Sequence, residues 1–389
     1  MNILTIPYIA GGLSHLLPLY VLQQKYLRDN SGIKNHFLVN DNSQKLLTMQ
    51  GIDFVPVNYT LKENLLKPGS PQEIKEDIID MEKRAYEIVQ PSLIIEDTSM
   101  LSPLIAEKNK IPRISIQRTG IFRSIDKSHR NEKHVHSLEK GNTGNSSENP
   151  SVLFTSNEDF NAPFLTQYAH PKAKIIPGIP TIERLPENIE NRNSYFYSGP
   201  LVVMDKPSKN LSVRLEEFLC NNKGKPVVFI TTGTIDKTPI ENFIEFFVQR
   251  NYAVITTCYC GINEKYSREI LYNKILPLHH ICGISDLVIH QCGSGMYHYP
   301  IMNRIPSLTL GTQCYDREDV ALRLQELGVS AHIPHPDDNP EYWNIFLKKI
   351  EQFENKTLID YKMMDDLRNE INETITDFNM EKVIAYALT

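Results

Sequence analysis

The chain has 389 residues, of which 41% are hydrophobic and 23% are charged. Since one hydrophobic core rarely grows beyond about 250 to 300 residues, this length predicts two domains of similar size. The composition is typical of a globular enzyme and excludes a largely disordered chain. The formal net charge of −6 is too small to indicate a nucleic acid or an anionic membrane as partner.

Membrane segments and export signals are not expected. The sequence has no run of the roughly 18 to 20 apolar residues that a membrane helix needs. The N-terminal run Asn2–Ala10 is broken by Pro7 and has no basic leader, so it predicts a first strand. The six cysteines lie in the second half without a Cys-x-x-Cys pair, which favours reduced, mostly buried thiols over disulfides or structural zinc. These features predict a cytoplasmic protein.

The first half alternates short apolar runs with longer amphipathic stretches, which is typical of parallel sheets with crossover helices. Strands are expected at residues 2–7, 35–39, 53–57, 92–96 and 113–117. A helix is expected over residues 72–90 and should end at Pro91, because proline disfavours helix at the residue before it. Residues 127–150 are polar and without periodicity, which predicts a mobile surface loop.

The second half repeats this alternation. Its expected elements are strands at residues 225–232, 252–257, 286–290 and 307–310 and a helix at 238–250. A linker is expected near residues 200–211, and the last 40 residues should be helical, with a terminal helix that returns to the first domain. The fold class is therefore α/β, with two doubly wound, Rossmann-like domains and a ligand cleft at the carboxyl ends of their strands.

The strongest local signal is the run SDLVIHQCGSGMYHYP, residues 285–300, in which an apolar strand leads into Gly293-Ser294-Gly295 and then a helix. Glycines permit a tight turn and close approach of a ligand, and the amides at a helix start favour phosphate. Since position 298 is His298, the third glycine of Gly-x-Gly-x-x-Gly is missing and a dinucleotide cofactor is disfavoured. An ordinary strand-to-helix turn is the alternative.

A second glycine turn follows the expected strand PVVFITTGT. Its residues Thr231, Thr232, Gly233 and Thr234 offer hydroxyl and amide groups to a diphosphate. Many ordinary turns between a strand and a helix have this composition, so the turn alone does not establish a site.

Two side chains of the first half suit acid–base chemistry. His15 follows the first strand and a glycine turn, and histidine titrates near pH 6.5, close to working pH. Asp97 stands at the end of another expected strand, where a carboxylate can orient an imidazole. The alternatives are a packing or capping role for His15 and helix capping for Asp97.

With these residues in view, the chain resembles the family 1 GT-B glycosyltransferases, which include macrolide, glycopeptide and plant secondary-metabolite glycosyltransferases. The run DLVIHQCGSGMYHYPIMNRIPSLTL is similar to the family's strand, His-His-Gly-Gly-x-Gly-Thr turn, helix, Gly-x-Pro and strand. CYDREDVALRLQELGVS resembles its sugar-contacting Asp-Gln segment, while YFYSGPL and GGLSHLLPL resemble its Val-Gly-Pro-Leu and Gly-His-x-x-Pro segments. The resemblance covers nearly the whole length, with the four segments in the family's order.

The resemblance implies an inverting transfer of sugar from a nucleoside diphosphate to a hydroxyl of a small-molecule acceptor, in natural-product biosynthesis. It makes His15 the base and Asp97 the carboxylate that orients it. The donor-binding positions that it implies are Thr232, Gly233, Thr234, His290, Gln291, Gly293, Ser294, Gly295, Met296, Tyr299, Asp316 and Arg317. No metal and no cofactor are expected, because backbone amides at helix ends carry the charge that a cation would neutralise.

The sequence departs from the family pattern at four of these positions. Gln291 replaces the second histidine, Met296 replaces the threonine, and Arg317 replaces the glutamine after Asp316. Glutamine still donates a hydrogen bond but brings no charge to a phosphate. Tyr299 stands where relatives have the glutamate that holds both ribose hydroxyls. Its loss matters least for a deoxyribose, so a thymidine diphosphate (dTDP) sugar is favoured over a uridine diphosphate (UDP) sugar. The alternative is that another residue holds the ribose or that Tyr299 turns into the core.

Three functions follow from the resemblance. The leading one is glycosyl transfer, with residues 1–200 binding the acceptor, residues 212–372 binding the nucleotide sugar and residues 373–389 forming the terminal helix. The first alternative is a catalytically silent protein that binds a nucleotide sugar or assists a partner enzyme, because the same fold hosts both roles. The second is a hydrolase or epimerase that acts on the nucleotide sugar itself.

Overall fold

The structure is a computed structural model and describes most of the chain. The described residues are 1–7, 13–30, 32–40, 44, 47–48, 54–59, 83–97, 106, 109–119, 171–185, 189, 191–232, 240–312 and 315–389. They form two compact units: unit 1 is Met1–Leu201 with Thr374–Thr389, and unit 2 is Val202–Glu373. Within the described ranges, no helix is both long enough and apolar enough to cross a membrane.

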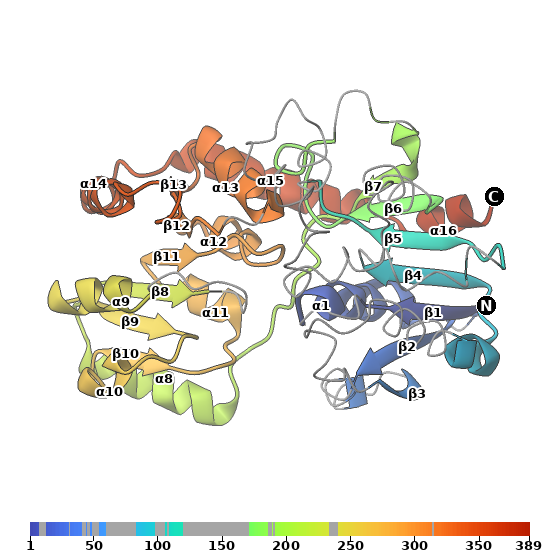
Figure 1. Cartoon of the computed structure of the whole chain (residues 1–389), viewed down its shortest axis with the longest axis horizontal. Helices are drawn as coiled ribbons and strands as arrows, with labels where there is room; N and C mark the ends of the chain where they lie inside the picture. Colours follow the sequence, from blue (N-terminus) through green and yellow to red (C-terminus); the bar gives the residue numbers. More distant parts are fainter. Residues whose placement is uncertain are drawn as a thin grey trace. The chain divides into compact units, whose positions relative to one another are not determined.

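Unit 1 is built on a parallel sheet of seven strands in the order β3-β2-β1-β4-β5-β6-β7 (Figure 1). Its strands are β1 (Asn2–Ile6), β2 (Lys34–Asn40), β3 (Phe54–Tyr59), β4 (Leu93–Asp97), β5 (Arg113–Ile116), β6 (Ala173–Ile176) and β7 (Tyr195–Tyr197). Helix α1 (Leu13–Leu22) packs on β4. Every residue of β4 and β5 is buried, as expected for central strands of a parallel sheet covered on both faces.

Unit 2 repeats this design with six parallel strands in the order β10-β9-β8-β11-β12-β13. The strands are β8 (Val227–Thr231), β9 (Ala253–Thr256), β10 (Ile270–Tyr272), β11 (Leu287–His290), β12 (Ser307–Leu310) and β13 (Ala331–Ile333). The helices are α8 (Lys209–Asn221), α9 (Ile240–Gln249), α10 (Ile262–Lys265), α11 (Leu278–Gly283), α12 (His298–Asn303), α13 (Tyr315–Glu326) and α14 (Tyr342–Glu354).

Alternating side chains of the unit 2 strands supply two separate cores. Val228 and Ile230 of β8 join a cluster with helices α9 and α14, in which Phe243 meets Phe346 edge to face at 4.8 Å. Phe229, between them, joins a second cluster with helices α8, α11 and α12. Because successive side chains of a strand point to opposite faces, one apolar run covers both faces of the sheet.

The strand order reverses at one point in each sheet, between β1 and β4 in unit 1 and between β8 and β11 in unit 2. All described strand pairs are parallel, so their carboxyl ends meet at one edge of each sheet. Open α/β sheets bind ligands at this edge, next to the reversal point. The segments singled out in the sequence follow β1, β4, β8 and β11.

The structure confirms the nine expected strands, with ends shifted by no more than about two residues. It also has β6, β7, β10 and β13, short strands of three or four residues that the sequence analysis missed. The described part of the helix expected over 72–90, residues 83–89, is helical. Helix α8 begins at Lys209, inside the segment expected as linker. The Ser208 side chain caps it by accepting a hydrogen bond from the Leu211 amide.

The loop expected at 127–150 lies outside the described residues.

Two helices end the chain. Helix α15 (Tyr361–Asp377) begins in unit 2, and α16 (Met380–Leu388) belongs to unit 1, where it packs on β5 and β6. Tyr386 of α16 meets Phe196 of β7 edge to face at 5.6 Å. The C-terminal helix therefore completes the core of unit 1.

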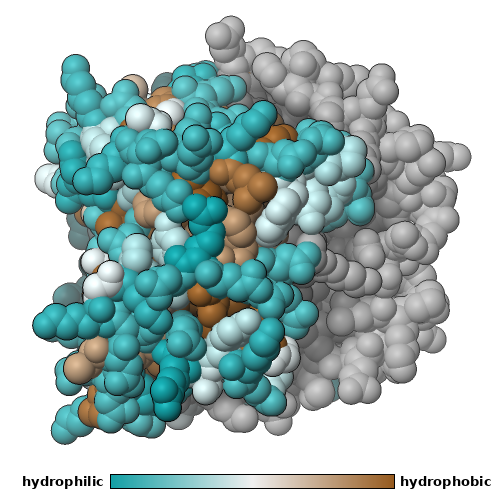
Figure 2. Space-filling model, turned by 90° about the vertical axis from the view of Figure 1, so that its left-hand side faces the viewer, coloured by the Kyte–Doolittle hydropathy of each residue, from teal (hydrophilic) through white to brown (hydrophobic). Residues whose placement is uncertain are grey.

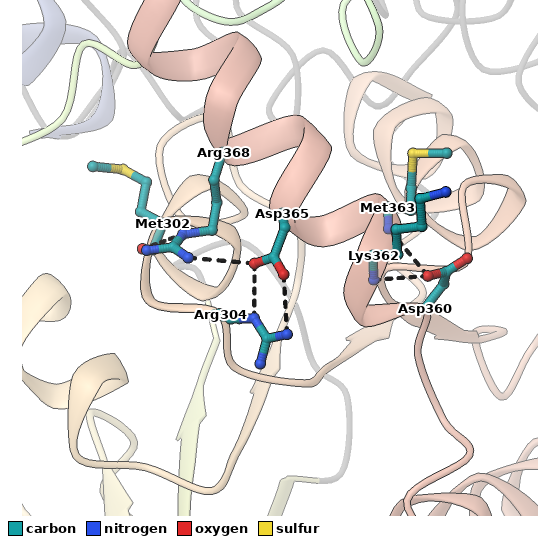
Figure 3. A network of polar contacts seen from close by, with 7 residues as sticks. All are labelled: Met302, Arg304, Asp360, Lys362, Met363, Asp365 and Arg368. Atoms are coloured by element: carbon teal, nitrogen blue, oxygen red, sulfur yellow. Dashed lines mark hydrogen bonds and ion pairs between the residues drawn. The ribbon is translucent and has the colours of Figure 1, made fainter.

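A polar network holds the first part of α15 in unit 2 (Figure 3). Arg304 donates to both carboxylate oxygens of Asp365, at 2.7 and 3.0 Å. Arg368 donates to Asp365 at 3.4 Å and to the Met302 carbonyl at 3.2 Å. Asp360 accepts from two backbone amides of the first turn. These contacts join α15 to the end of α12.

Gly311, directly after β12, is a position where any side chain would meet backbone. A Cβ there would lie 2.9 Å from the carbonyl carbon of Pro334 and still closer to the amide of His335. We expect Gly311→Ala to lower the free energy of unfolding by about 1 to 3 kcal/mol, because the backbone of Pro334 and His335 after β13 must move to make room for the added Cβ. Urea unfolding followed by circular dichroism measures this. Gly261→Ala is the control, since its Cβ meets nothing within 4 Å, and equal losses for both variants would contradict the prediction.

Candidate functional site

The first group of candidate residues lies at the carboxyl edge of the unit 1 sheet. His15 is in the first turn of α1 and Asp97 is the last residue of β4. The Nδ1 atom of His15 lies 2.9 Å from Oδ1 of Asp97. The His15 side chain is 23% exposed, whereas the carboxylate is fully buried. With Nδ1 bound to the carboxylate, Nε2 is the ring nitrogen placed to accept a proton from a substrate.

A third residue, which the sequence analysis missed, completes this group. Arg118 follows β5 by two residues and donates to both oxygens of Asp97, at 2.7 and 3.1 Å. Its side chain is almost as deeply buried as the carboxylate. The available signal was positional: β5 neighbours β4, so a basic residue just past its end reaches the same edge as Asp97. The structure thus brings together His15, Asp97 and Arg118.

Asp97 is ionised at neutral pH. Burial by itself would raise the pKa of this carboxyl, but the Arg118 guanidinium and the His15 ring outweigh burial and lower the pKa to about 2. The two hydrogen-bonding partners act in the same direction as their charges. A buried carboxylate that stays charged needs partners of this kind.

The segment that carries Arg118 is itself fixed by buried hydrogen bonds. The backbone amide of Thr119 donates to the Glu183 carboxylate at 3.1 Å, and the Thr119 hydroxyl donates to the same oxygen. Tyr197 of β7 donates its hydroxyl to the Glu183 carbonyl at 2.6 Å. The position of Arg118 is therefore set by the scaffold of unit 1 as well as by Asp97.

The second group of candidate residues follows β8 and β11 in unit 2. The Thr232 hydroxyl lies 2.9 Å from the Cys258 sulfur, just past β9. His290, the last residue of β11, is fully buried, and its Nδ1 accepts a hydrogen bond from the Cys292 amide at 3.0 Å. Burial lowers the pKa of His290 to about 3, so its ring is neutral and Nε2 carries the proton. Within the described part of the chain this Nε2 has no hydrogen-bond partner.

The glycine turn after β11 leads into helix α12, in the order expected from the sequence. Gly293, Ser294, Gly295 and Met296 are half-buried, and the Met296 amide donates to the Gly293 carbonyl at 2.8 Å. Helix α12 begins only at His298 and has six residues. Pro300 is tolerated in the first turn of α12, because amide hydrogens in the first turn of a helix have no carbonyl partner within that helix. The helix expected after Gly293-Ser294-Gly295 therefore begins at His298, and the Met296 amide is used inside the turn.

Tyr299 lies in the core of unit 2. It is 5% exposed and packs in the cluster that includes Val202 and Phe218. Its hydroxyl donates to the Val203 carbonyl at 2.9 Å, and burial raises its pKa. An aromatic ring on this face of α12 gains more from the apolar core than from the surface. The hydroxyl is therefore used inside unit 2, in agreement with the alternative in which Tyr299 turns into the core and not with the ribose contact that the resemblance implied.

The segment that resembles the family's sugar-contacting Asp-Gln segment starts α13. Arg317 is half-buried, and the backbone of Asp316 is helical, while its side chain, like Gly233 and Thr234, lies outside the described residues. A network that the sequence analysis missed anchors this helix. Glu318 accepts from the Thr312 amide at 2.6 Å and pairs with Nε2 of His332 at 3.0 Å.

The amino edge of the unit 2 sheet carries a cavity of about 500 Å³. Its lining residues include Pro226, Asp286 and Pro306, each of which directly precedes a strand. Figure 2 views the molecule from the side of Figure 1 on which α14 lies, and apolar side chains gather there within a largely hydrophilic face. This cavity is at the opposite edge of the sheet from Thr232 and His290.

Asp97→Asn tests the electrostatics of the first group. Because the pKa of Asp97 lies below the value of about 3.9 in unfolded chains, its carboxylate stabilises the fold above about pH 4, and this contribution is lost as pH falls toward 2. We expect Asp97→Asn to lower the free energy of unfolding at pH 7 by about 3 to 5 kcal/mol, because Arg118 is left buried without its counter-charge. Urea unfolding at pH 7 and pH 3 measures the effect, which should be smaller at pH 3.

The matched control is Asp205→Asn, which removes an exposed carboxylate from unit 2. Its stability should equal that of the parent protein at both pH values. A loss at Asp97→Asn no larger than that of Asp205→Asn would contradict the buried ion pair.

Comparison with known proteins identifies the fold. No protein-family model and no curated protein matches the sequence. Solved structures do match. UGT71G1 of Medicago truncatula, complexed with UDP-glucose, has a TM-score of 0.71 and 12% identity, over 99% of this chain and 98% of its own. The spinosyn forosaminyltransferase SpnP has a TM-score of 0.63 and 19% identity, over 99% of both chains.

A third similar structure is the glycosyltransferase VinC in complex with dTDP, with a TM-score of 0.60 and 16% identity, over 100% of this chain and 99% of its own. Matches at such low identity establish a fold and not an activity. The chain has the GT-B fold of these glycosyltransferases, with two Rossmann-like α/β units.

Proposed function

We propose that this protein transfers a sugar from a nucleoside diphosphate sugar to a hydroxyl of a small-molecule acceptor. The observation that carries the proposal is the 2.9 Å contact between His15 and Asp97 at the strand-reversal edge of unit 1. A partly exposed imidazole held by a buried carboxylate is the arrangement of a general base. The fold supports the same reaction, since SpnP and VinC are named glycosyltransferases or sugar transferases.

In the proposed mechanism, Nε2 of His15 takes the proton of the acceptor hydroxyl. Asp97 holds the ring through Nδ1 and stabilises the imidazolium that forms. The resulting oxygen nucleophile displaces the nucleoside diphosphate from the anomeric carbon. Because a single displacement occurs from the face opposite the leaving group, the anomeric configuration inverts.

Unit 2 is the proposed donor-binding unit, and unit 1 the proposed acceptor-binding unit. The turn Gly293–Met296 and the turn that starts at Thr232 would hold the diphosphate with backbone amides and hydroxyls. His290 is proposed to donate from Nε2 as a neutral ring. Preorganised donors of this kind stabilise the charge on a leaving diphosphate, so the proposed reaction needs no metal ion.

A second candidate function is nucleotide-sugar binding without transfer. It is motivated by Gln291 and Met296, which replace the family's histidine and threonine, and by the burial of Tyr299. Release of nucleoside diphosphate separates the possibilities. Release that depends on an acceptor supports transfer, release in water alone indicates a hydrolase, and binding without release indicates the silent protein.

His15→Ala tests the proposed base. We expect turnover to fall by about 10² to 10⁴ while nucleotide affinity is unchanged, because the base acts on the acceptor and the donor contacts belong to unit 2. Acceptor-dependent release of nucleoside diphosphate measures turnover, and calorimetry measures affinity. His280→Ala removes an exposed histidine and is the control. Transfer by His15→Ala at the parental rate would remove His15 from the mechanism.

The donor nucleotide is tested by binding. Since position 299 supplies no carboxylate and its tyrosine is buried, the bidentate contact that would select a ribose is missing there. We expect calorimetry to show dTDP binding several-fold more tightly than UDP. Gly295→Val should abolish binding of both, because the added side chain occupies the proposed diphosphate turn. Equal or reversed affinities would refute the preference for dTDP but leave the proposed transfer intact.

A further inference from the structure

Two side-chain contacts join the ends of β8 and β9 at the carboxyl edge of the unit 2 sheet. The hydroxyl oxygens of Thr231 and Thr257 lie 2.7 Å apart, and the hydroxyl oxygen of Thr232 lies 2.9 Å from the Cys258 sulfur. Thr232 starts the turn that is proposed to hold the donor diphosphate. Thr257 and Cys258 directly follow β9, and the sequence analysis did not single them out. Strand β9 therefore brings polar side chains to the proposed donor site.

The backbone of Cys258 is held by hydrogen bonds on both sides. Its amide donates to the Thr256 hydroxyl at 3.0 Å, and its carbonyl accepts from the side-chain amide of Asn263 at 3.1 Å. Asn263 is a buried residue of α10, and its side-chain oxygen accepts a hydrogen bond from the Cys260 thiol at 3.0 Å. These contacts fix the position of the Cys258 sulfur relative to the Thr232 hydroxyl.

A separate observation at the same edge indicates that a hydrogen-bond acceptor binds there. His290 of β11 is in register with Thr231, the residue before Thr232. Its Nδ1 accepts from the Cys292 amide, so its Nε2 carries the proton. Nε2 is fully buried and has no partner among the residues that the structure describes. A buried donor without a partner costs free energy, and a ligand that supplies an acceptor removes this cost.

The single proton of the Thr232 hydroxyl links the thiol to such a ligand. In the free protein, either Thr232 or Cys258 can donate in their contact. Once the hydroxyl donates its proton to a phosphate oxygen, its own oxygen can only accept from Cys258. The thiol must then be the donor.

We propose that Cys258 is a positioning residue of the donor site, whose thiol donates to Oγ1 of Thr232 and thereby directs the Thr232 proton to a phosphate oxygen of the nucleotide. The inference rests on the proposed function, because it deepens the proposed donor site. It requires nucleotide binding but not transfer, so it holds equally for a protein that binds a nucleotide sugar without transferring it.

The experiment is calorimetric titration of the full-length protein with dTDP, and with UDP in parallel. We expect Cys258→Ala to weaken binding by about threefold to tenfold, which is the range that one hydrogen bond contributes. Cys258→Ser keeps a donor at the same place, so its affinity should stay within about twofold of the parent. Cys220→Ala removes an exposed thiol of α8 and is the control, with parental affinity expected.

A double-mutant cycle with Thr232→Val distinguishes positioning from a purely structural role. Thr232→Val removes the hydroxyl on which Cys258 is proposed to act, so Cys258→Ala should cause no further loss of affinity in that background. If Cys258 only supports the fold of the loop, the two losses should add. Parental affinity in Cys258→Ala, equal losses in Cys258→Ala and Cys258→Ser, or additive losses in the cycle would overturn the proposal.

Circular dichroism checks that each variant folds. If Cys258→Ala does not fold, Cys258→Val takes its place in the comparison, because valine fills the space of the thiol without supplying a donor. Failure of the proposed function gives a different result. A parent protein that binds neither dTDP nor UDP would refute the proposed donor site and this inference together, whereas a parent that binds dTDP as tightly as Cys258→Ala does would refute this inference alone.

Discussion

A fully buried negative charge, the carboxylate of Asp97, constrains the rest of unit 1. Such a group is tolerated only where hydrogen-bonding and charged partners surround it. The two partners that the structure describes, His15 of α1 and Arg118 after β5, reach Asp97 at the end of β4. They meet because β1, β4 and β5 are adjacent and parallel, so that their carboxyl ends lie at one edge. The scaffold extends further, since Glu183 and Tyr197 fix the segment that carries Arg118. The sheet topology therefore determines which side chains surround the Asp97 carboxylate and hold the proposed base.

Unit 2 uses the same topology with different chemistry. Two described residues at its strand-reversal edge are neutral: the ring of His290 is uncharged, and Thr232 offers a hydroxyl. Neutral hydrogen-bond donors suit the proposed diphosphate, which is already negatively charged and gains further negative charge when its bond to the sugar breaks. The proposed division of labour follows, with proton transfer in unit 1 and stabilisation of the leaving group in unit 2.

The nearness of His15 and Asp97 could be predicted from the sequence because it depends on position along the chain. Asp97 ends an apolar strand and His15 opens the helix that follows another, and parallel strands bring such ends together. The rest depends on where side chains point. Arg118 was missed because it contacts Asp97 from the segment after the neighbouring strand. The orientation of Tyr299 stayed open because a motif fixes its position in α12 but not that its ring enters the core.

A single base and a single displacement require inversion at the anomeric carbon, and this is the most direct test of the proposed chemistry. The measurement is the NMR coupling at the anomeric proton of the product formed from a donor with an α-linked sugar. We predict one β-linked product. An α-linked product would show a retaining reaction, and free sugar without a glycosylated acceptor would show hydrolysis; either result would contradict direct displacement by an acceptor that His15 deprotonates.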